Sequence, residues 1–428
     1  MAVAKQAIVD IVADEMLVRN ALAVAQRRLT FSRVLVINGP RQSGKTVLMR
    51  MLHDRKGGSW KSLDDATTLL AARRDSGGFV RETERPLFVD EVQRAGNPLI
   101  LAVKGAVDND NRPGQFVLAG STRFLFEPRL SESLAGRALF VDLWPLSQGE
   151  IGRIEHEDLV TKAFAGTQSL LASGAVGESR HATMERVCRG GMPQATALNG
   201  RNRREFLAAY ARTIASRDIT EIGRLPTAFD LPTMMRVLAG RTSAELNTTE
   251  IARVVGASPD VTKRVLSMLE TVYFHYRVPA WSRNLTAKAT RRPKLHVTDS
   301  GLAAALCGLD ADAMRRPEAT SSGAFLESFV VGEIARQLTW SETEASLFHW
   351  RDRDGAEVDV VLERPSGEVV GIEVKAAVDV HASDAKGLRA LRDRLGSTFA
   401  CGIVLHHGDT VQQIDDRIVA APISLLWT

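Results

Sequence analysis

The sequence predicts an α/β protein of three domains, and three observations support this prediction. A glycine-rich loop lies between an apolar strand and a helix near the N-terminus. Two short helices with a capping pattern occupy the middle of the chain, and strands alternate with helices in the last third. Because a chain of 428 residues exceeds the usual domain size of about 100–200 residues, several domains are expected. We place them at 1–150, 151–320 and 321–428.

Composition and charge exclude several classes of protein. The hydrophobic fraction of 44% and the charged fraction of 25% are near globular averages and argue against disorder. No apolar run approaches the roughly 20 residues that cross a bilayer, so no membrane partner is expected. The three cysteines, Cys188, Cys307 and Cys401, are widely spaced, which fits a reducing compartment. A cytoplasmic location is therefore expected.

A phosphate-binding loop follows the apolar run 34–38. The next residues read G-P-R-Q-S-G-K-T and lead into a helix, which is the strand, G-x-x-x-x-G-K-[ST], helix order of a P-loop. In such a loop backbone N–H groups face the phosphates, Lys45 reaches the β- and γ-phosphates, and Thr46 is a magnesium ligand. The expected cofactors are ATP and Mg²⁺, held by Gly39, Pro40, Arg41, Gln42, Ser43, Gly44, Lys45, Thr46 and Val47.

Two carboxylates end the next apolar strand, at Pro86–Asp90 and Glu91. Asp90 is the expected partner of Thr46 in the magnesium shell, and Glu91 is the expected catalytic residue that polarises the attacking water. A third strand, 115–120, ends at Ser121, whose hydroxyl is placed to sense the γ-phosphate. Arg137 is a candidate for neutralising transition-state charge, in cis or from a neighbouring subunit; the alternative is an ordinary surface arginine.

The middle of the chain predicts a helix-turn-helix unit. A capping pattern opens the helix at 246–256, and a second helix follows over 258–271. Between Arg253 and Lys294 there are nine basic residues against two acidic ones. This imbalance favours phosphate contact and makes DNA a candidate partner. The alternative is a unit that only packs on the N-terminal domain, with its charges solvated.

The last third carries a second group of polar residues. We expect a helix over 323–338 bearing Glu327, strands at 346–350, 357–362 and 369–374, a helix over 384–395 and a strand at 399–406. Strand alternation places Asp359 near Glu373 and Lys375. Such a group suits metal-dependent phosphodiester cleavage, with Glu327, Asp359 and Glu373 as metal ligands and Asp359, Glu373 and Lys375 as catalytic residues. The alternative is a structural charge cluster on a domain that only binds.

The chain resembles the bacterial and archaeal AAA+-type P-loop ATPases that have a winged-helix-like middle and a C-terminal restriction-endonuclease-like domain of unknown function. The resemblance rests on the P-loop together with Leu63-Asp64-Asp65, Asp90-Glu91-Val92-Gln93, Ala119-Gly120-Ser121, Ser133-Leu134-Ala135-Gly136-Arg137, and Pro145-Leu146-Ser147 with Glu150. It departs at Ala119, where the family often has Thr, and at Ser43, where it often has Val. The resemblance implies an ATPase architecture.

Two functions remain open from the sequence. The first is an ATP-hydrolysing enzyme that acts on nucleic acid, with a nuclease site in its C-terminal domain. The second is a nucleotide-regulated switch or scaffold that binds a protein partner, with a C-terminal domain that is not catalytic. Further copies of the same chain are also candidate partners in either case.

Overall fold

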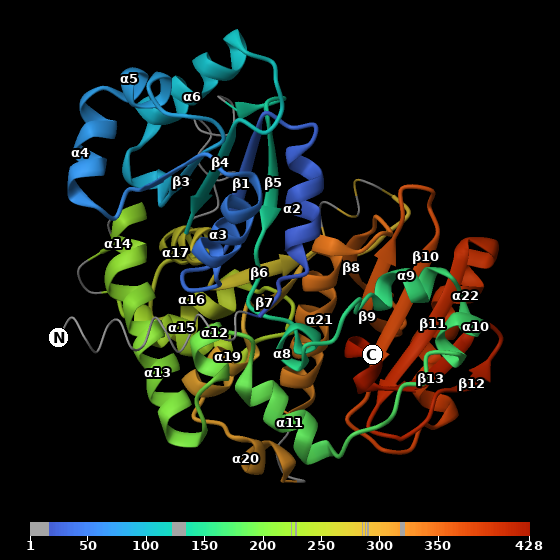
Figure 1. The fold of residues 1–428 in the computed structure, drawn as a ribbon. Helices are drawn as coiled ribbons and strands as arrows, with labels where there is room; N and C mark the ends of the chain where they lie inside the picture. The colour runs from blue at the N-terminus through green and yellow to red at the C-terminus, as the bar shows by residue number, and fades with distance from the viewer. Residues whose placement is uncertain are drawn as a thin grey trace.

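The computed structural model describes residues 17–121, 134–223, 225–226, 229–284, 286, 288, 291–316 and 322–428. Figure 1 shows an N-terminal α/β region, a helical middle and a C-terminal sheet beside it. Among the described residues, no helix is long and apolar enough to cross a membrane.

The N-terminal sheet is parallel, with strand order β2-β3-β4-β1-β5. Alternate residues of β1 enter two different cores, because both faces of the sheet are covered by helices. Leu35 and Ile37 pack with α2 and α3, whereas Val34 and Val36 pack with α4, α5 and α6. The elements are β1 Val34–Asn38, β2 Ser59–Ser62, β3 Leu87–Asp90, β4 Phe116–Gly120, β5 Ala138–Asp142, α2 Ala21–Leu29, α3 Lys45–Lys56, α4 Ala66–Arg74, α5 Ser76–Arg81 and α6 Asn97–Asn109.

The middle region is mostly helical and contains a pair of antiparallel strands, β6 and β7. The two predicted helices are present as α16 and α17, the first capped by Asn247 and ended by Gly256 in a left-handed conformation. Residues 200–222 form α13, a π-helical turn and α14. The bounds are α11 Arg180–Arg189, α12 Pro193–Thr196, α13 Gly200–Thr213, η3 Ile214–Asp218, α14 Ile219–Ile222, α15 Leu231–Gly240, α16 Thr248–Val255, α17 Pro259–Thr271, β6 His275–Val278, β7 Lys294–Val297, α19 Ser300–Leu306 and α20 Ala311–Arg315.

The C-terminal sheet has the order β12-β13-β11-β10-β9-β8. Helix α21 packs against one face through Phe325 and Phe329, and α22 packs against the other through Leu388 and Leu391. The predicted order of helices and strands up to 406 is confirmed. The bounds are α21 Ser322–Trp340, β8 Ser346–Arg351, β9 Glu357–Glu363, β10 Val369–Val374, α22 Lys386–Leu395, β11 Phe399–His406, β12 Gln412–Asp415 and β13 Ile418–Pro422.

The short helices before the middle region belong by packing to the C-terminal sheet. Helices α9 Leu159–Phe164 and α10 Thr167–Leu171 contact β11 and β13, and the Cys401 thiol lies 3.2 Å from the Ala163 carbonyl oxygen. Figure 1 shows both helices beside this sheet. The C-terminal sheet is therefore covered partly by residues that precede 321.

Candidate nucleotide site and C-terminal carboxylate cluster

The P-loop connects β1 to α3 and is shaped by two glycines and a strained residue. Gly44 has φ of 95°, and Gln42 has φ of 61°, which is uncommon for a residue with a side chain. A Cβ on Gly39 would lie 2.3 Å from the Leu143 carbonyl oxygen, so only glycine fits there. The Ser43 hydroxyl is buried and has no hydrogen-bond partner among the described residues. The two glycines of the sequence pattern are thus needed where the loop lies against Leu143 and where its backbone turns into α3.

Lys45 lies under the loop rather than in solvent. Its ammonium donates hydrogen bonds to the carbonyl oxygens of Gly39 at 3.0 Å and Pro40 at 2.8 Å. Burial lowers the pKa of Lys45 to about 8, against the opposing effect of Glu91 and Asp90. A phosphate brought to this loop would therefore meet a desolvated ammonium, whose attraction for an anion is stronger than in water.

Thr46 and Asp90 lie together, as predicted. The Thr46 hydroxyl donates to Asp90 Oδ2 at 2.7 Å, and burial raises the pKa of Asp90. A hydroxyl and a carboxylate are the hard oxygen ligands that Mg²⁺ uses in nucleotide sites, where phosphates and water complete its shell. The residues present therefore fit a magnesium ion.

Glu91 follows Asp90 with φ of 54°, a left-handed conformation that turns its side chain towards the end of β4. Gln93 Nε2 donates to Glu91 Oε2 at 2.5 Å and to the Ser121 hydroxyl oxygen at 3.0 Å. The Ser121 hydroxyl lies 3.4 Å from the same Glu91 oxygen. Glu91, predicted to activate water, thus lies beside Ser121, predicted to sense the γ-phosphate. The Gln93 amide joins them, and the sequence indicated no role for it.

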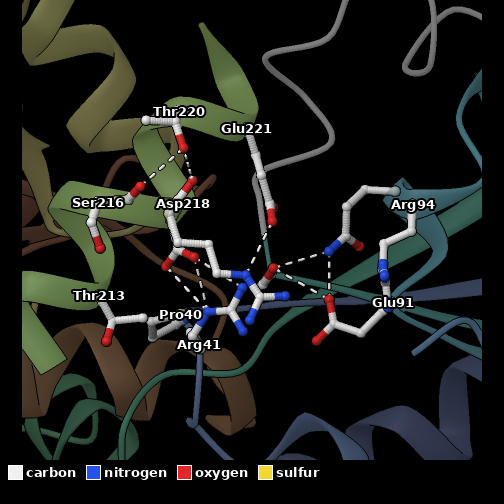
Figure 2. A network of polar contacts seen from close by, with 12 residues as sticks. Pro40, Arg41, Glu91, Arg94, Thr213, Ser216, Asp218, Thr220 and Glu221 are labelled. Atoms are coloured by element: carbon white, nitrogen blue, oxygen red, sulfur yellow. Dashed lines mark hydrogen bonds and ion pairs between the residues drawn. The ribbon is translucent and has the colours of Figure 1, made fainter. Parts of the chain in front are cut away.

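Arg41 connects the P-loop to the middle region. Its guanidinium pairs with the Asp218 carboxylate at 2.9 Å, and its backbone oxygen accepts a hydrogen bond from the Tyr210 hydroxyl at 3.0 Å. Figure 2 shows the guanidinium between Asp218 and Glu221 on one side and Glu91 on the other. Burial alone would lower the pKa of Arg41, but these three carboxylates raise it above its usual value. Asp218 and Tyr210 have no sequence pattern that could have indicated this contact.

Arg19 holds the P-loop through backbone contacts that its sequence position did not indicate. It is 4% exposed and donates to the backbone oxygens of Ser43 at 2.7 Å and Trp144 at 2.8 Å. Its Nε donates to Glu150 at 3.1 Å. The sequence around Arg19 could not predict these contacts, because its partners lie 24 to 131 positions away in the chain.

Arg137 does not lie at the P-loop of its own chain. It precedes β5, which pairs in parallel with β1 so that Ala138 lies beside Val34 and Asp142 beside Asn38. The P-loop follows the opposite end of β1, so a role for Arg137 in cis is wrong. Its guanidinium pairs with Asp108 at 2.5 Å. A role in a neighbouring subunit stays a prediction.

Asp359, Glu373 and Lys375 are brought together as alternation predicts. Strands β9 and β10 are antiparallel, with Val360 opposite Ile372. Asp359 Oδ2 accepts the backbone N–H of Val374 at 2.9 Å, and the Lys375 ammonium donates to Glu373 at 2.8 Å. Burial, together with the nearby Asp359 carboxylate, raises the pKa of Glu373 to about 8.

The expected metal site is not formed, because Lys294 occupies the position between the carboxylates. Its ammonium lies 2.7 Å from Glu327, 2.6 Å from Glu357 and 3.5 Å from Asp359. In the described part of the chain, no group of three or more His, Cys, Asp or Glu residues is arranged to hold a metal ion. In this arrangement Glu327, Asp359 and Glu373 are not grouped as a metal site, and their role as metal ligands stays a prediction. Lys294 itself had been counted among the basic residues expected to face phosphate.

Comparisons with known proteins assign the regions separately. Residues 31–152 match the model of an AAA domain, residues 180–313 match a domain of unknown function (DUF8612), and residues 322–426 match another (DUF4143). Residues 31–152 form an AAA-type P-loop domain. This AAA domain contains every predicted nucleotide-binding residue.

Two relatives match over nearly the whole chain. They are uncharacterized proteins of Mycobacterium bovis and Mycobacterium tuberculosis, each 26% identical over 421 residues, covering 96% of this chain and 84% of the relative. Among solved structures, a Walker-type ATPase of Pyrococcus abyssi has a TM-score of 0.43 at 12% identity, covering 68% of this chain and 96% of that one. The RuvB Holliday junction branch migration motor of Thermotoga maritima has a TM-score of 0.29 at 18% identity, covering 60% and 87%.

Proposed function

We propose that this chain is a magnesium-dependent ATPase that acts on nucleic acid. The observation that carries the ATPase proposal is the contact of 2.7 Å between the Thr46 hydroxyl and the Asp90 carboxylate, beside the buried ammonium of Lys45. Thr46 and Asp90 would hold Mg²⁺, which when bound neutralises phosphate charge. The loop from Gly39 to Val47 would bind the phosphates through its N–H groups.

The chain's own residues suit water activation. Glu91 is fixed by the Gln93 amide and by its left-handed backbone, so its carboxylate is positioned before nucleotide arrives. A positioned carboxylate accepts a proton from, or orients, the attacking water. The Lys45 ammonium would give up its hydrogen bonds to the Gly39 and Pro40 carbonyl oxygens and donate to phosphate oxygens instead. Ser121 would contact the γ-phosphate or the attacking water.

The nucleic-acid part of the proposal is supported by basic side chains outside the AAA domain. Arg253 and Lys263 are exposed on α16 and α17, and Arg291 and Arg292 are exposed before β7. Others of the nine basic residues are engaged: Arg277 pairs with Glu270, and Lys288 pairs with Glu363. Because the Lys294 ammonium already lies among three of the C-terminal carboxylates, we propose that the C-terminal domain binds nucleic acid and does not cleave it.

A second candidate is a nucleotide-regulated switch that binds a protein partner. The ion pair between Arg41 and Asp218 favours it, because this contact joins the P-loop to a π-helical turn of the middle region. Such turns occur often at functional positions. In this function, nucleotide would change the pairing of Arg41 and so the position of α13 and α14.

ATP turnover with and without DNA separates the candidates. Lys45→Ala should abolish tight binding of a fluorescent ATP analogue, whereas Glu91→Gln should keep binding and lose hydrolysis. Stimulation of wild-type turnover by DNA would support the enzyme. Unchanged nucleotide affinity in the Lys45 variant would contradict the assignment of the site, and nucleotide-dependent self-association without DNA affinity would favour the switch.

A further inference from the structure

A groove lies where the middle region meets the C-terminal sheet. The Trp281 N–H donates to the His349 carbonyl oxygen at 2.6 Å, and the His349 N–H donates to the Pro279 oxygen at 3.0 Å. These backbone bonds join the segment after β6 to β8. His349 Nε2 also contacts the Arg292 oxygen at 3.2 Å, and because a carbonyl only accepts, Nε2 is the donor. The walls of the groove are therefore held by main-chain contacts.

Four arginines line this groove, two from each wall. Arg291, Arg292, Arg351 and Arg353 surround a cavity of about 360 Å³, and we call this set the arginine groove. Arg291 donates to the Arg351 backbone oxygen at 3.2 Å, so its guanidinium stays available for further hydrogen bonds. Neither Arg292 nor Arg353 has an ion-pair or hydrogen-bond partner for its side chain among the residues that the structure describes, and both are exposed. In the described part of the chain, the Arg292 and Arg353 guanidinium groups therefore line the groove without an ion-pair partner of their own.

The side chains that line the arginine groove leave it with a net positive charge. Its lining carries four arginines against two carboxylates, Glu245 and Asp352, which leaves a net charge of +2. The Asp352 carboxylate is engaged by the backbone N–H groups of Asp354 at 2.9 Å and Ala356 at 2.7 Å. Glu245 approaches Arg351 only to 3.8 Å. Burial lowers the pKa of His349 to about 4, so this histidine is neutral at pH 7.

The adjoining cavity has a different charge balance. It has a volume of about 400 Å³, shares Glu245, Arg292 and Arg351 with the arginine groove, and extends to Lys294 and Glu327. Its four basic and four acidic side chains balance, and Arg241 there is paired with Glu250 at 2.7 Å. A polyanion is therefore attracted to the arginine groove, and the balanced charges of the adjoining cavity offer it no further electrostatic attraction.

We propose that the arginine groove binds the phosphodiester backbone of a nucleic acid strand. Guanidinium groups match phosphate oxygens in bidentate geometry, and groups unpaired in the free protein gain most from that contact. The cavity volume is in the range of small-ligand sites, which suits one or two phosphates of a strand rather than a whole duplex. The inference rests on the proposed action on nucleic acid and assigns its contact site.

The test is binding of a labelled oligonucleotide, single-stranded and as a duplex, measured by fluorescence anisotropy at several salt concentrations. The key variant is Arg292→Gln with Arg353→Gln, since neither side chain has a partner among the described residues whose loss would affect folding. Arg212→Gln with Arg394→Gln is the matched control: both arginines are exposed, on α13 and α22, and no partner is recorded for them in the described residues. Basal ATP turnover is measured for every protein.

Loss of two phosphate contacts should reduce the slope of log K against log salt by about 1.5 and weaken binding on the order of 30-fold at 0.1 M salt. The control variant should bind within about twofold of wild type. The proposal is overturned if wild type does not bind, if the key variant binds like the control, or if polyglutamate competes as well as the oligonucleotide. If one of these three outcomes is found while ATP turnover is normal, the proposed ATPase activity still stands. If turnover is absent while oligonucleotide binding is normal, only the proposed ATPase activity is refuted.

Discussion

Lys294→Met should destabilise the protein far more than removal of an ordinary surface lysine. The Lys294 ammonium is 5% exposed and lies within 3.5 Å of three carboxylates, on Glu327, Glu357 and Asp359. Removing one partner of a buried ion pair costs about 3–5 kcal/mol, because the remaining charges stay desolvated. We expect about 3 kcal/mol here, at the lower end, since the Glu357 side chain is 33% exposed and water screens it.

That loss should lower the melting temperature by about 6–12 °C, taking 2–4 °C per kcal/mol for a domain of this size. Circular dichroism melts of wild type, Lys294→Met and the exposed-lysine control Lys386→Met give the comparison. Adding Glu327→Gln to Lys294→Met removes one unpaired charge and should recover part of the loss. A Lys294 variant that melts within 2 °C of wild type, or a double variant no more stable than the single one, would refute the reasoning.

Three further predictions follow from the site geometry. Asp359→Asn should lower stability and leave ATP turnover unchanged, and no magnesium-dependent cleavage of labelled DNA should appear in wild type; cleavage lost in the variant would restore the nuclease hypothesis. Asp218→Asn should free Arg41 from its ion pair and tighten ATP binding by up to about tenfold, measured with a fluorescent analogue; weaker binding would show that the pair supports the loop. Burial, with Glu333 and Glu150 nearby, raises the pKa of Glu157 from its usual 4.5 to about 8, so the folded protein keeps a proton that the unfolded chain releases. The free energy of unfolding should therefore fall as pH rises from about 5 to 8, by up to a few kcal/mol, and urea denaturation of Glu157→Gln should show a smaller fall.

The sequence predicted the parts whose physical cause is local. The apolar runs at Val34–Asn38, Val369–Val374 and Phe399–His406 are strands with the predicted bounds. Strand alternation placed Asp359 beside Glu373 because antiparallel pairing depends only on the turn between β9 and β10. Strands β12 and β13 were not predicted: Gln412–Asp415 is short and polar, and it is a strand only because β13 lies beside it.

Contacts between distant segments could not be predicted. Lys294 counted as one cation in a basic stretch, and nothing in its neighbours indicates that Glu327 and Glu357 would surround it. A charge count therefore assigned to phosphate contact a side chain that is buried. Arg137 shows the same limit: it was a candidate for neutralising transition-state charge, but the parallel pairing of β1 with β5 places it at the end of the sheet away from the P-loop. Arg19 carried no signal at all.

The two arginines on the P-loop have different consequences for how nucleotide affects the rest of the molecule. Arg19 donates to the Ser43 oxygen and to Glu150, which also caps α8 Gln148–Gly152, so it fixes the loop to a buried network. Arg41 instead pairs with Asp218 on a π-helical turn, and its guanidinium is only partly buried. If ATP draws the Arg41 guanidinium to a phosphate, the ion pair with Asp218 must break. Part of the free energy of ATP binding then goes into releasing the turn between α13 and α14 from the P-loop. Linkage then requires a reciprocal effect. If a partner binds better when Asp218 is separated from Arg41, that partner tightens ATP binding by the same factor by which ATP tightens the binding of the partner. Because Tyr210 binds the backbone of Arg41 and not its side chain, a Tyr210→Phe variant should change the loop's stability but not this coupling.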